Sequence, residues 1–255
     1  MSKPYVIGID MGGTNTVFGI VDARGIVLAS SSIKTGKHSN IVDYIDELHH
    51  EIMRLLEAND AVDKINGIGI GAPNANYFTG MIEENVNLPW PSPIPLAQML
   101  MDKFNIPVAI TNDANAAAIG EMTYGAARGL RDFIMITLGT GVGSGIVVNG
   151  QLVYGHDGFA GELGHMIVKR NNGRLCGCGR TGCLEAYCSA TGVARTAREF
   201  LEVRQEPSTL RNLQIEDITS KDVYDAAVAG DKLAKEIFEY TGKILGEAMA
   251  DMTLF

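Results

Sequence analysis

Two stretches of this chain, offset by 126 positions, share one pattern of short apolar runs separated by glycine turns. The first covers residues 5–33 and the second covers residues 133–155, and each predicts strand, Gly/Thr turn, strand, tight turn and strand. The match is clearest between residues 19–27 (GIVDARGIV) and residues 145–153 (GIVVNGQLV). Two glycine-rich β-meanders can look alike by chance. A duplicated α/β unit with a cleft between the copies explains the placement as well, and we favour this second interpretation.

The segment between the two stretches alternates helical and strand patterns, which is typical of an α/β fold. Residues 41–58 place apolar side chains three and four positions apart, as an amphipathic helix requires. A strand that ends at Pro73, a helix over 95–104 and a buried strand over 107–111 are expected to follow. The last strand delivers Asp113 to a strand end, and ligands of open α/β sheets collect at the carboxyl ends of strands.

The composition of the 255 residues limits the class of protein. Hydrophobic residues make up 46% of the chain and charged residues 20%, as expected for a soluble globular protein. The net charge of -9 and the lack of any Lys/Arg cluster argue against a nucleic-acid partner. The sequence has no signal-peptide pattern, and its longest apolar runs are far below the ~18 residues of a membrane span. We therefore expect a cytoplasmic protein with no membrane partner.

Two glycine turns carry the residues that phosphate binding requires. DMGGTN (10–15) and LGTGVGSG (138–145) each place backbone N–H groups and a Thr hydroxyl on a tight bend. Such bends form concavities for anions, and glycine permits close approach of the chain. The alternative is that these glycines only form hairpin turns. Asp10 favours phosphate binding at the first turn, because a carboxylate at the end of an apolar strand is costly unless it meets a cation such as magnesium.

Other nucleotide-binding motifs can be checked directly in the sequence. The chain contains no G-x-x-x-x-G-K-[ST] segment, which excludes a P-loop. One G-x-G-x-x-G pattern occurs, at Gly177, Gly179 and Gly182. It lies among cysteines and not between a strand and a helix, so we interpret it as a chance match.

All four cysteines lie between residues 176 and 188, which in a reducing compartment indicates metal binding or packing more than disulfides. Cys176, Cys178 and Cys183 form a knuckle in a glycine-rich loop, a pattern typical of tetrahedral zinc. The fourth ligand could be Cys188 or a histidine. Cys188 follows Cys183 by five positions on a predicted helix and does not share its face, so His165 is the better candidate. The alternative is a set of free buried thiols.

Three acidic residues are candidates for a catalytic or binding role, and each also has a purely structural explanation. Asp113, in TNDANAAAIGE (111–121), could be only the N-cap of a helix. Glu162, in a glycine-rich loop, could be a solvated turn acid. Glu185 could be a first-turn acid that the helix dipole favours.

A series of motifs along the chain carries a resemblance to a known family. In order, the motifs are DMGGTN, GIGAP, NLPW, TNDANAAAIGE, LGTGVGSG, GELGH and CGCGRTGCLEA. Together they resemble the ROK family of sugar kinases over nearly the whole chain. The resemblance implies an actin-like ATPase (ribonuclease-H-like) α/β fold with two lobes and a central cleft. We expect an N-terminal lobe over 1–111 and a C-terminal lobe with the zinc knuckle over 112–255, and a homodimer, which is common in the family.

The resemblance also implies a role for each matching residue. Asp113 matches the catalytic base that takes the proton from the attacking sugar hydroxyl. The residues that match or extend the sugar contacts are Asn87, Asn112, Glu162, His165 and Glu185. The phosphate contacts, beside the magnesium-facing Asp10, are Gly12, Gly13, Thr14, Gly139, Thr140 and Gly141. The zinc ligands are His165, Cys176, Cys178 and Cys183.

The function that the resemblance implies is ATP-dependent phosphorylation of a hexose, with glucose at its 6-hydroxyl as the favoured substrate. ATP, Mg²⁺ and a structural Zn²⁺ are the expected cofactors. N-acetylmannosamine, N-acetylglucosamine and fructose stay open as substrates, and the rival function is a catalytically silent sugar-binding or regulatory module. Members of the family continue for some tens of residues through a segment that cradles adenosine, so we expect this chain to lack that segment. Related repressors carry an N-terminal helix-turn-helix, for which a first strand at residue 5 leaves no room.

Overall fold

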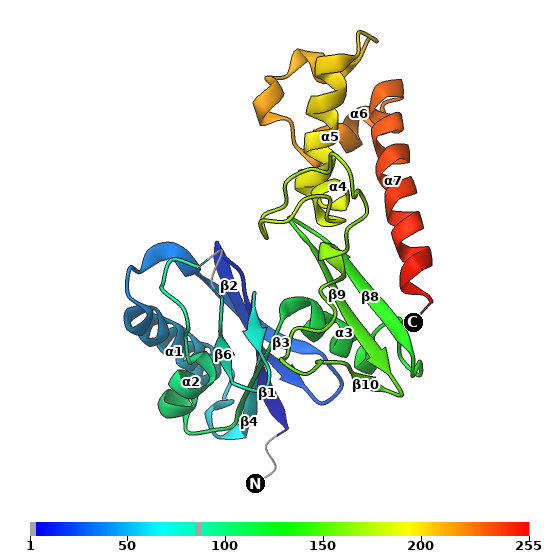
Figure 1. Cartoon of the computed structure of the whole chain (residues 1–255). Helices are drawn as coiled ribbons and strands as arrows, with labels where there is room; N and C mark the ends of the chain where they lie inside the picture. Colours follow the sequence, from blue (N-terminus) through cyan, green and yellow to red (C-terminus); the bar gives the residue numbers. More distant parts are fainter. Residues whose placement is uncertain (1–3, 85–87, 255) are drawn as a thin grey trace. The chain divides into compact units, whose positions relative to one another are not determined.

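The computed structural model describes residues 4–84 and 88–254 (Figure 1). The chain divides into two units, each built from two segments of the sequence. Unit 1 comprises Met1–Met135 and Gly145–Gly161, and unit 2 comprises Ile136–Ser144 and Glu162–Phe255. The expected lobe boundary after residue 111 stays a prediction.

Unit 1 is built on a mixed five-stranded sheet. Its strands, in spatial order, are β3 (Val27–Lys34), β2 (Asn15–Asp22), β1 (Tyr5–Met11), β4 (Ile65–Gly71) and β7 (Val108–Thr111). β1 pairs antiparallel with β2 and β2 with β3, whereas β1 and β4, and β4 and β7, are parallel. The three antiparallel strands predicted from the first glycine-rich stretch are therefore confirmed, as are the two later strands.

Three long helices accompany this sheet. They are α1 (Ile41–Ala58), α2 (Leu96–Phe104) and α3 (Asp113–Tyr124). The Asn40 side chain begins α1 by accepting a hydrogen bond from the Val42 N–H at 2.9 Å. The buried side chains of α1 are Tyr44, Ile45, Leu48, Ile52 and Leu56, at the helical spacing that the sequence predicted.

The two faces of the sheet have different environments, and the alternation along β1 decides which residues meet each one. Ile7, Ile9 and Met11 are buried in the core formed with α1 and α2. Because successive side chains of a strand point to opposite faces, Asp10 lies on the other face. That face also receives α3, which contacts β4.

The second glycine-rich stretch forms a three-stranded sheet of order β10-β9-β8, and it thereby confirms the strand pattern predicted for residues 133–155. Its strands are β8 (Phe133–Leu138), β9 (Val142–Val148) and β10 (Gln151–Leu152). A two-stranded sheet pairs β5 (Ala75–Asn76) with β6 (Met81–Ile82). The short 3-10 helices are η1 (Thr35–Lys37), η2 (Val62–Lys64), η3 (Leu163–His165), η4 (Thr209–Asn212) and η5 (Ile215–Asp217).

Unit 2 carries the remaining helices around a small apolar core. They are α4 (Glu185–Cys188), α5 (Ala190–Val203), α6 (Ser220–Val228) and α7 (Lys232–Met252). The core gathers apolar side chains of α5, α6 and α7, including Leu201, Val223 and Ile237. Across residues 4–84 and 88–254, no helix combines the length and the apolar character that crossing a bilayer requires.

The core face of α1 predicts a large difference between two positions on the same helix. Ile52 is 1% exposed, whereas Val42 is 48% exposed. Ile52→Ala should lower the free energy of unfolding by about 2–5 kcal/mol, because it removes buried methyl groups and leaves a cavity. Val42→Ala, the control, should change it by less than about 0.5 kcal/mol. Urea denaturation followed by circular dichroism measures both values, and equal losses would contradict the assignment of the core face.

Candidate functional site

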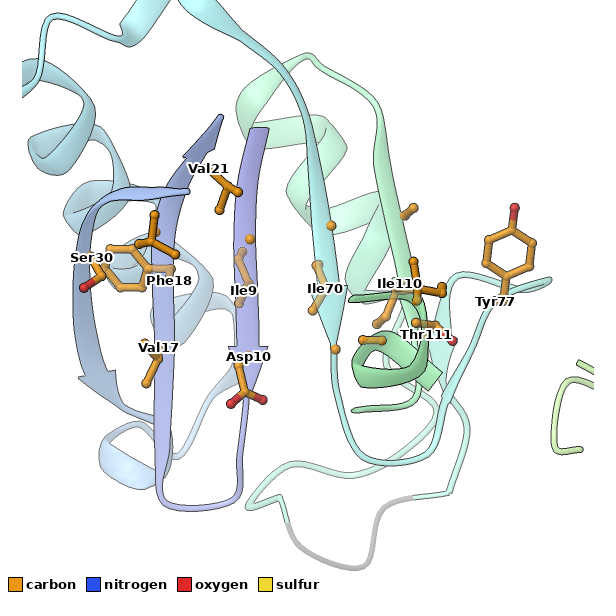
Figure 2. Close-up of a pocket in the computed structure, with 18 of the residues that line it drawn as sticks. Ile9, Asp10, Val17, Phe18, Val21, Ser30, Ile70, Tyr77, Ile110 and Thr111 are labelled. Atoms are coloured by element: carbon orange, nitrogen blue, oxygen red, sulfur yellow. The ribbon is translucent and has the colours of Figure 1, made fainter. Parts of the chain in front are cut away.

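A pocket of about 500 Å³ opens on the face of the unit 1 sheet that carries Asp10 (Figure 2). Most of its lining is apolar, with residues from β1, β2, β4, β7 and α3. Asp10 and Thr111 are polar members of the lining. Two aromatic rings, Tyr77 and Tyr154, border the pocket and stack at 4.4 Å between ring centroids. The pocket therefore brings polar groups at strand ends onto one apolar surface.

Asp113 lies close enough to Asp10 to affect the ionisation of Asp10. Burial raises the pKa of Asp10, and the negative charge of Asp113 raises it further. A bound cation would oppose both effects, because it stabilises the charged form of the Asp10 carboxyl group. Unit 1 thus brings Asp10, expected from the sequence to face magnesium, close to Asp113, which follows β7 and was expected from the family resemblance to be the base.

Asp113 is the first residue of α3, and the N-cap is its neighbour Asn112. The Asn112 Oδ1 atom accepts a hydrogen bond from the Ala114 N–H at 2.8 Å, and the Asp113 Oδ1 atom accepts from the same N–H at 2.7 Å. The explanation of Asp113 as the N-cap is therefore wrong, because a neighbouring amide has that position. The exposed Asp113 side chain keeps its second carboxylate oxygen without a hydrogen bond from any described residue.

The first glycine turn connects β1 to β2. The Gly12 N–H donates to the Asn15 carbonyl at 3.0 Å and so closes the turn. Gly13 and Thr14, at its tip, are exposed. A Cβ added at Gly12 would stand 3.1 Å from the Asn15 carbonyl oxygen, a crowded distance that explains the glycine. The residues between β1 and β2 thus form the tight turn that the glycines predicted.

The second glycine turn, between β8 and β9, is held by side chains and backbone of unit 2. The Ala190 N–H donates to the Gly139 carbonyl at 2.8 Å, and the Thr191 hydroxyl donates to the Thr140 carbonyl at 3.1 Å. The first two residues of α5 thus hold the carbonyl groups of Gly139 and Thr140, both of which are exposed. A Cβ added at Gly141 would lie 2.5 Å from a Glu185 carboxylate oxygen, so a larger residue here would displace the Glu185 side chain from this position.

Glu185 connects the second glycine turn to the cysteine cluster. Its Oε2 atom accepts from the Val142 N–H at 2.9 Å, and its Oε1 atom lies 3.6 Å from the Cys176 sulfur, which donates to it. Glu185 is also the first residue of α4, as the helix-dipole explanation expects. The carboxylate thus has a structural task in addition to the sugar contact implied by the family resemblance.

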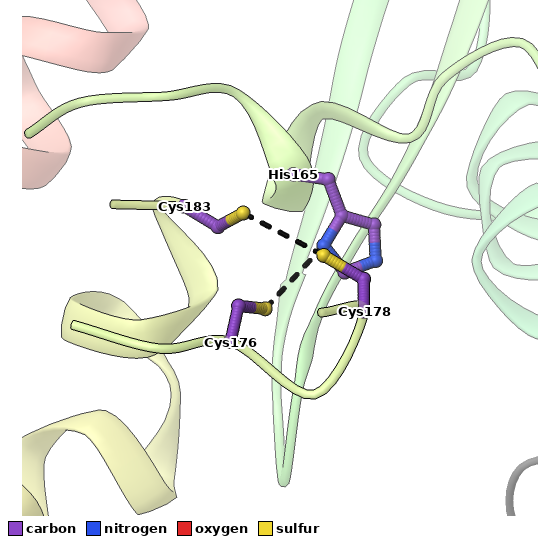
Figure 3. Close-up of side chains that lie close together, drawn as sticks. All are labelled: His165, Cys176, Cys178 and Cys183. Carbon is purple, nitrogen blue, oxygen red and sulfur yellow. Dashed lines mark hydrogen bonds between the residues drawn. The ribbon is translucent and has the colours of Figure 1, made fainter. Parts of the chain in front are cut away.

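The cysteine cluster has the dimensions of a tetrahedral metal site (Figure 3). One ligand atom from each of His165, Cys176, Cys178 and Cys183 lies within 4.8 Å of the others. The Cys178 and Cys183 sulfurs are 3.7 Å apart, and the Cys176 sulfur is 3.7 Å from the His165 Nδ1 atom. Tetrahedral Zn–S bonds of about 2.3 Å place two sulfurs about 3.8 Å apart, so these residues fit zinc.

Cys188 stays outside this group, as the spacing on the helix predicted. It is buried, and its sulfur donates to the Thr241 carbonyl at 3.6 Å. Burial raises the pKa of the Cys188 thiol to about 11, which keeps it protonated at neutral pH. Hydrogen bonds from the Arg180 backbone and side chain outweigh burial at Cys178 and lower the pKa of that thiol to about 7. Cys178 is therefore the thiol that most readily forms a metal-binding thiolate.

Glu162 precedes the short helix η3, and His165 is the last residue of that helix. Glu162 is its N-cap, and the Leu163 N–H donates to the Ser144 hydroxyl at 3.1 Å, which ties the helix to β9. The His165 Nε2 atom lies 3.9 Å from a Glu162 carboxylate oxygen, whereas the Nδ1 atom faces Cys176. The two ring nitrogens thus face two different partners, so one can bind a metal while the other stays near Glu162.

The structure therefore gathers the predicted residues in two groups. Unit 1 holds Asp10, the Gly12–Thr14 turn, Asn112 and Asp113, and unit 2 holds the Gly139–Gly141 turn, Glu162, Glu185 and the metal-binding group. Asn87 lies outside the described residues. Sequence reasoning missed the aromatic pair of Tyr77 and Tyr154, because no local pattern links two residues so far apart in the chain.

Comparisons with known proteins place this chain among sugar kinases and related repressors. Residues 6–255 match the ROK family model. A glucokinase from Halalkalibacterium halodurans is 38% identical over 99% of this chain and 77% of its own length. A xylose repressor from Caldicellulosiruptor bescii is 29% identical over 97% of this chain and 62% of its own length.

A similar solved structure is that of a ROK family glucokinase from Streptomyces griseus in complex with glucose and AMPPNP. It is 32% identical to this chain, with a TM-score of 0.79, over 98% of this chain and 80% of that one. This likeness confirms the actin-like ATPase α/β fold that the motifs predicted.

Gly164, between Glu162 and His165, offers a test of the local packing in η3. A Cβ at this position would lie 2.0 Å from the Val142 carbonyl oxygen, which is backbone and cannot move aside cheaply. Gly164→Ala should therefore lower the free energy of unfolding by about 1–3 kcal/mol. Gly246→Ala, in the exposed interior of α7 with nothing within 4 Å, should raise it by about 0.5–1 kcal/mol. Thermal denaturation gives both signs, and a neutral Gly164→Ala would contradict the close approach.

Proposed function

The chain belongs to the ROK family, and on that premise we propose that it is an ATP-dependent kinase that phosphorylates a hexose at its 6-hydroxyl. Glucose is the proposed substrate, because the similar curated and solved proteins include glucokinases. N-acetylmannosamine, N-acetylglucosamine and fructose are the alternatives to compare. The single observation that carries the proposal is the exposed carboxylate of Asp113 at the start of α3, beside Asp10.

Asp113 is the proposed general base. It takes the proton of the sugar 6-hydroxyl while that oxygen forms a bond to the γ-phosphorus, and the bond from the γ-phosphorus to the β-γ bridging oxygen breaks to release ADP. Asn112 supports this role, because it caps α3 and so leaves one Asp113 oxygen for the proton. Phosphoryl transfer depends mainly on positioning and on charge stabilisation, so one carboxylate base is sufficient.

The phosphates of ATP are proposed to lie against the two glycine turns. The exposed backbone N–H groups of Gly13, Thr14 and Thr140 offer donors at the two turns, whereas the Gly139 N–H donates to the Gly141 carbonyl at 3.0 Å and closes the second turn. Asp10 would hold Mg²⁺ through water. A bound Mg²⁺ would supply positive charge beside the phosphates. The same cation would lower the raised pKa of Asp10, because it stabilises the carboxylate form.

The sugar hydroxyls are proposed to bind Asn112, Glu162, His165, Glu185 and Asn87. The Asn112 amide nitrogen is available, because only the oxygen of that side chain caps α3. The His165 Nε2 atom points toward Glu162 and away from the thiols, which supports a shared contact with hydroxyls. Polar groups that a bound sugar would cover discriminate strongly against a sugar that lacks a hydroxyl.

A structural Zn²⁺ is proposed at His165, Cys176, Cys178 and Cys183. The ligand spacing supports zinc, and four protein ligands leave no coordination position for a reacting water. The ion would stiffen the loop whose Cys176 contacts Glu185. We further propose that the protein acts in the cytoplasm as a homodimer, in line with the sequence analysis.

The rival function is a sugar-responsive module without turnover. The similarity to xylose repressors supports it, although the identity is lower than to the glucokinases. A coupled assay of ADP release over a panel of hexoses with Mg-ATP separates the two functions. Turnover of any hexose supports the kinase, and sugar binding without turnover supports the rival.

Asp113→Asn provides the sharpest test of the proposed base. We expect kcat to fall by at least ~100-fold, because the amide cannot accept the hydroxyl proton, while the Kd for glucose changes far less. Asp43→Asn is the matched control, since Asp43 is also a first-turn acid, in α1. It should retain the wild-type kcat. An Asp113→Asn enzyme as active as the wild type would overturn the assignment.

Zinc analysis by mass spectrometry tests the metal site. The purified wild type should contain about one zinc per chain, and Cys178→Ser should lose most of it, because a serine hydroxyl is a poor zinc ligand. Cys188→Ser should keep the wild-type content, since that sulfur contacts Thr241 instead. A stable wild-type protein without zinc, or equal loss in both variants, would contradict the proposed ligand set.

A further inference from the structure

Three hydroxyl groups form a hydrogen-bonded chain in the interior of unit 1. Thr16 of β2, Thr35 of η1 and Tyr44 of α1 are each 0% exposed. The Tyr44 hydroxyl lies 2.6 Å from the Thr16 Oγ1 atom, which lies 2.9 Å from the Thr35 Oγ1 atom. The Thr35 hydroxyl donates to the Gly12 carbonyl at 2.7 Å. The chain, which we call the hydroxyl relay, thus runs from a helix to the first glycine turn.

The direction of every hydrogen bond in the relay is fixed by its last member. A hydroxyl has a single proton to donate, and Thr35 gives its proton to the Gly12 carbonyl, which can only accept. Thr16 must therefore donate to Thr35, and Tyr44 must donate to Thr16. Bonds that all point the same way polarise and strengthen one another. The relay consequently delivers a strong donor to the turn.

The Tyr44 end of the relay is anchored firmly. Burial raises the pKa of Tyr44 to about 12, so its hydroxyl stays a donor across the neutral range. The Tyr44 ring packs 4.6 Å from the Trp90 ring, and the Trp90 Nε1–H donates to the His38 carbonyl at 3.0 Å. The first donor of the relay is therefore held by the core.

The first glycine turn is held by hydrogen bonds to its carbonyl groups. Beside the Gly12 carbonyl, the Thr14 carbonyl accepts from the Thr35 N–H at 3.0 Å, and the Asn15 carbonyl accepts from the Gly12 N–H. Thr35 thus binds the turn at two carbonyls. Among the described residues, the N–H groups of Gly13 and Thr14 have no acceptor. The turn is held through its carbonyls while donors at its exposed tip remain for a ligand.

We propose that Tyr44, Thr16 and Thr35 are positioning residues, which hold the Gly12–Thr14 turn in the shape that receives a nucleotide phosphate. This inference rests on the proposed kinase function, and it assigns a role to three residues that do not themselves contact the phosphate. A buried hydroxyl costs free energy unless it is hydrogen-bonded. If positions 16 and 35 needed only packing, valine would fill the same space without that cost. The hydroxyls instead fix a backbone that is otherwise free to change shape before the phosphate binds.

Variants along the relay should have graded effects. Thr35→Val keeps the side-chain shape and removes the donor to Gly12, so its effect should be the largest. Thr16→Val interrupts the relay one bond away, and Tyr44→Phe removes only the first donor, so the effects should decrease in that order. Thr35→Ser restores the hydroxyl and should recover most of the wild-type behaviour.

Thr196→Val is the matched control. Thr196 is also 0% exposed, and its hydroxyl donates to the Gly192 carbonyl at 2.9 Å, in α5 of unit 2. The substitution therefore removes a buried hydroxyl-to-carbonyl bond, here four residues apart within one helix, in the unit that does not contain the first glycine turn. Its loss of thermal stability should resemble that of Thr35→Val, which separates general destabilisation from positioning.

The first readout needs no ligand. Amide hydrogen exchange of Gly12, measured by NMR, should be about tenfold faster in Thr35→Val, because loss of one hydrogen bond to the turn favours its opened form. Exchange at Gly12 in Thr196→Val should stay within about twofold of the wild type. Equal exchange rates in Thr35→Val and wild type would overturn the proposal.

The second readout is nucleotide affinity. Thr35→Val should weaken Mg-ADP binding in calorimetry and raise the KM for Mg-ATP by about tenfold each, with the KM for the hexose unchanged, because only the phosphate turn is altered. If the wild type binds Mg-ADP but phosphorylates no hexose, the proposed kinase function fails. The amide exchange rates and the Mg-ADP affinities then still test the proposed role of the relay. A wild type that binds neither nucleotide, or a Thr35→Val variant with unchanged affinity, overturns the relay.

Discussion

The alternation of side chains along β1 is the constraint from which the rest of unit 1 follows. Ile7, Ile9 and Met11 enter the core beneath α1 and α2, and this burial fixes which way the strand faces. Asp10 then has to emerge on the opposite face, within the pocket. Because β1 is central in the five-stranded sheet, its register also sets where β2, β4 and the turn after Met11 are placed.

Both glycine turns share one physical problem, which is that a tight bend leaves backbone groups without regular partners. In both turns, residues distant in the sequence supply hydrogen bonds to these backbone groups. Thr35 binds the first turn at the carbonyls of Gly12 and Thr14, whereas Glu185 and Thr191 bind the second turn. A turn held in this way keeps its shape before a ligand arrives, which is what electrostatic preorganisation requires.

The cysteine cluster shows how a small loop acquires a fixed form without a core of its own. Cys176 and Cys178 come from a glycine-rich loop, Cys183 precedes α4, and His165 ends η3. A metal ion bound by all of them would join three local segments at one point. Glu185 extends that connection to β9, so the proposed zinc supports the second glycine turn as well as its own loop.

The sequence by itself determined the local elements, the glycine turns and the four residues of the proposed metal site, because periodicity and spacing act over a few residues. It also placed Asp113 at a strand end. Only the tertiary structure showed that Asn112 is the cap of α3, that Glu185 reaches Val142, and that Tyr44 donates through two threonines to Gly12. Thr16 and Tyr44 are 28 positions apart and Val142 and Glu185 are 43 apart, and such pairs meet only when buried apolar faces have fixed the packing of whole elements.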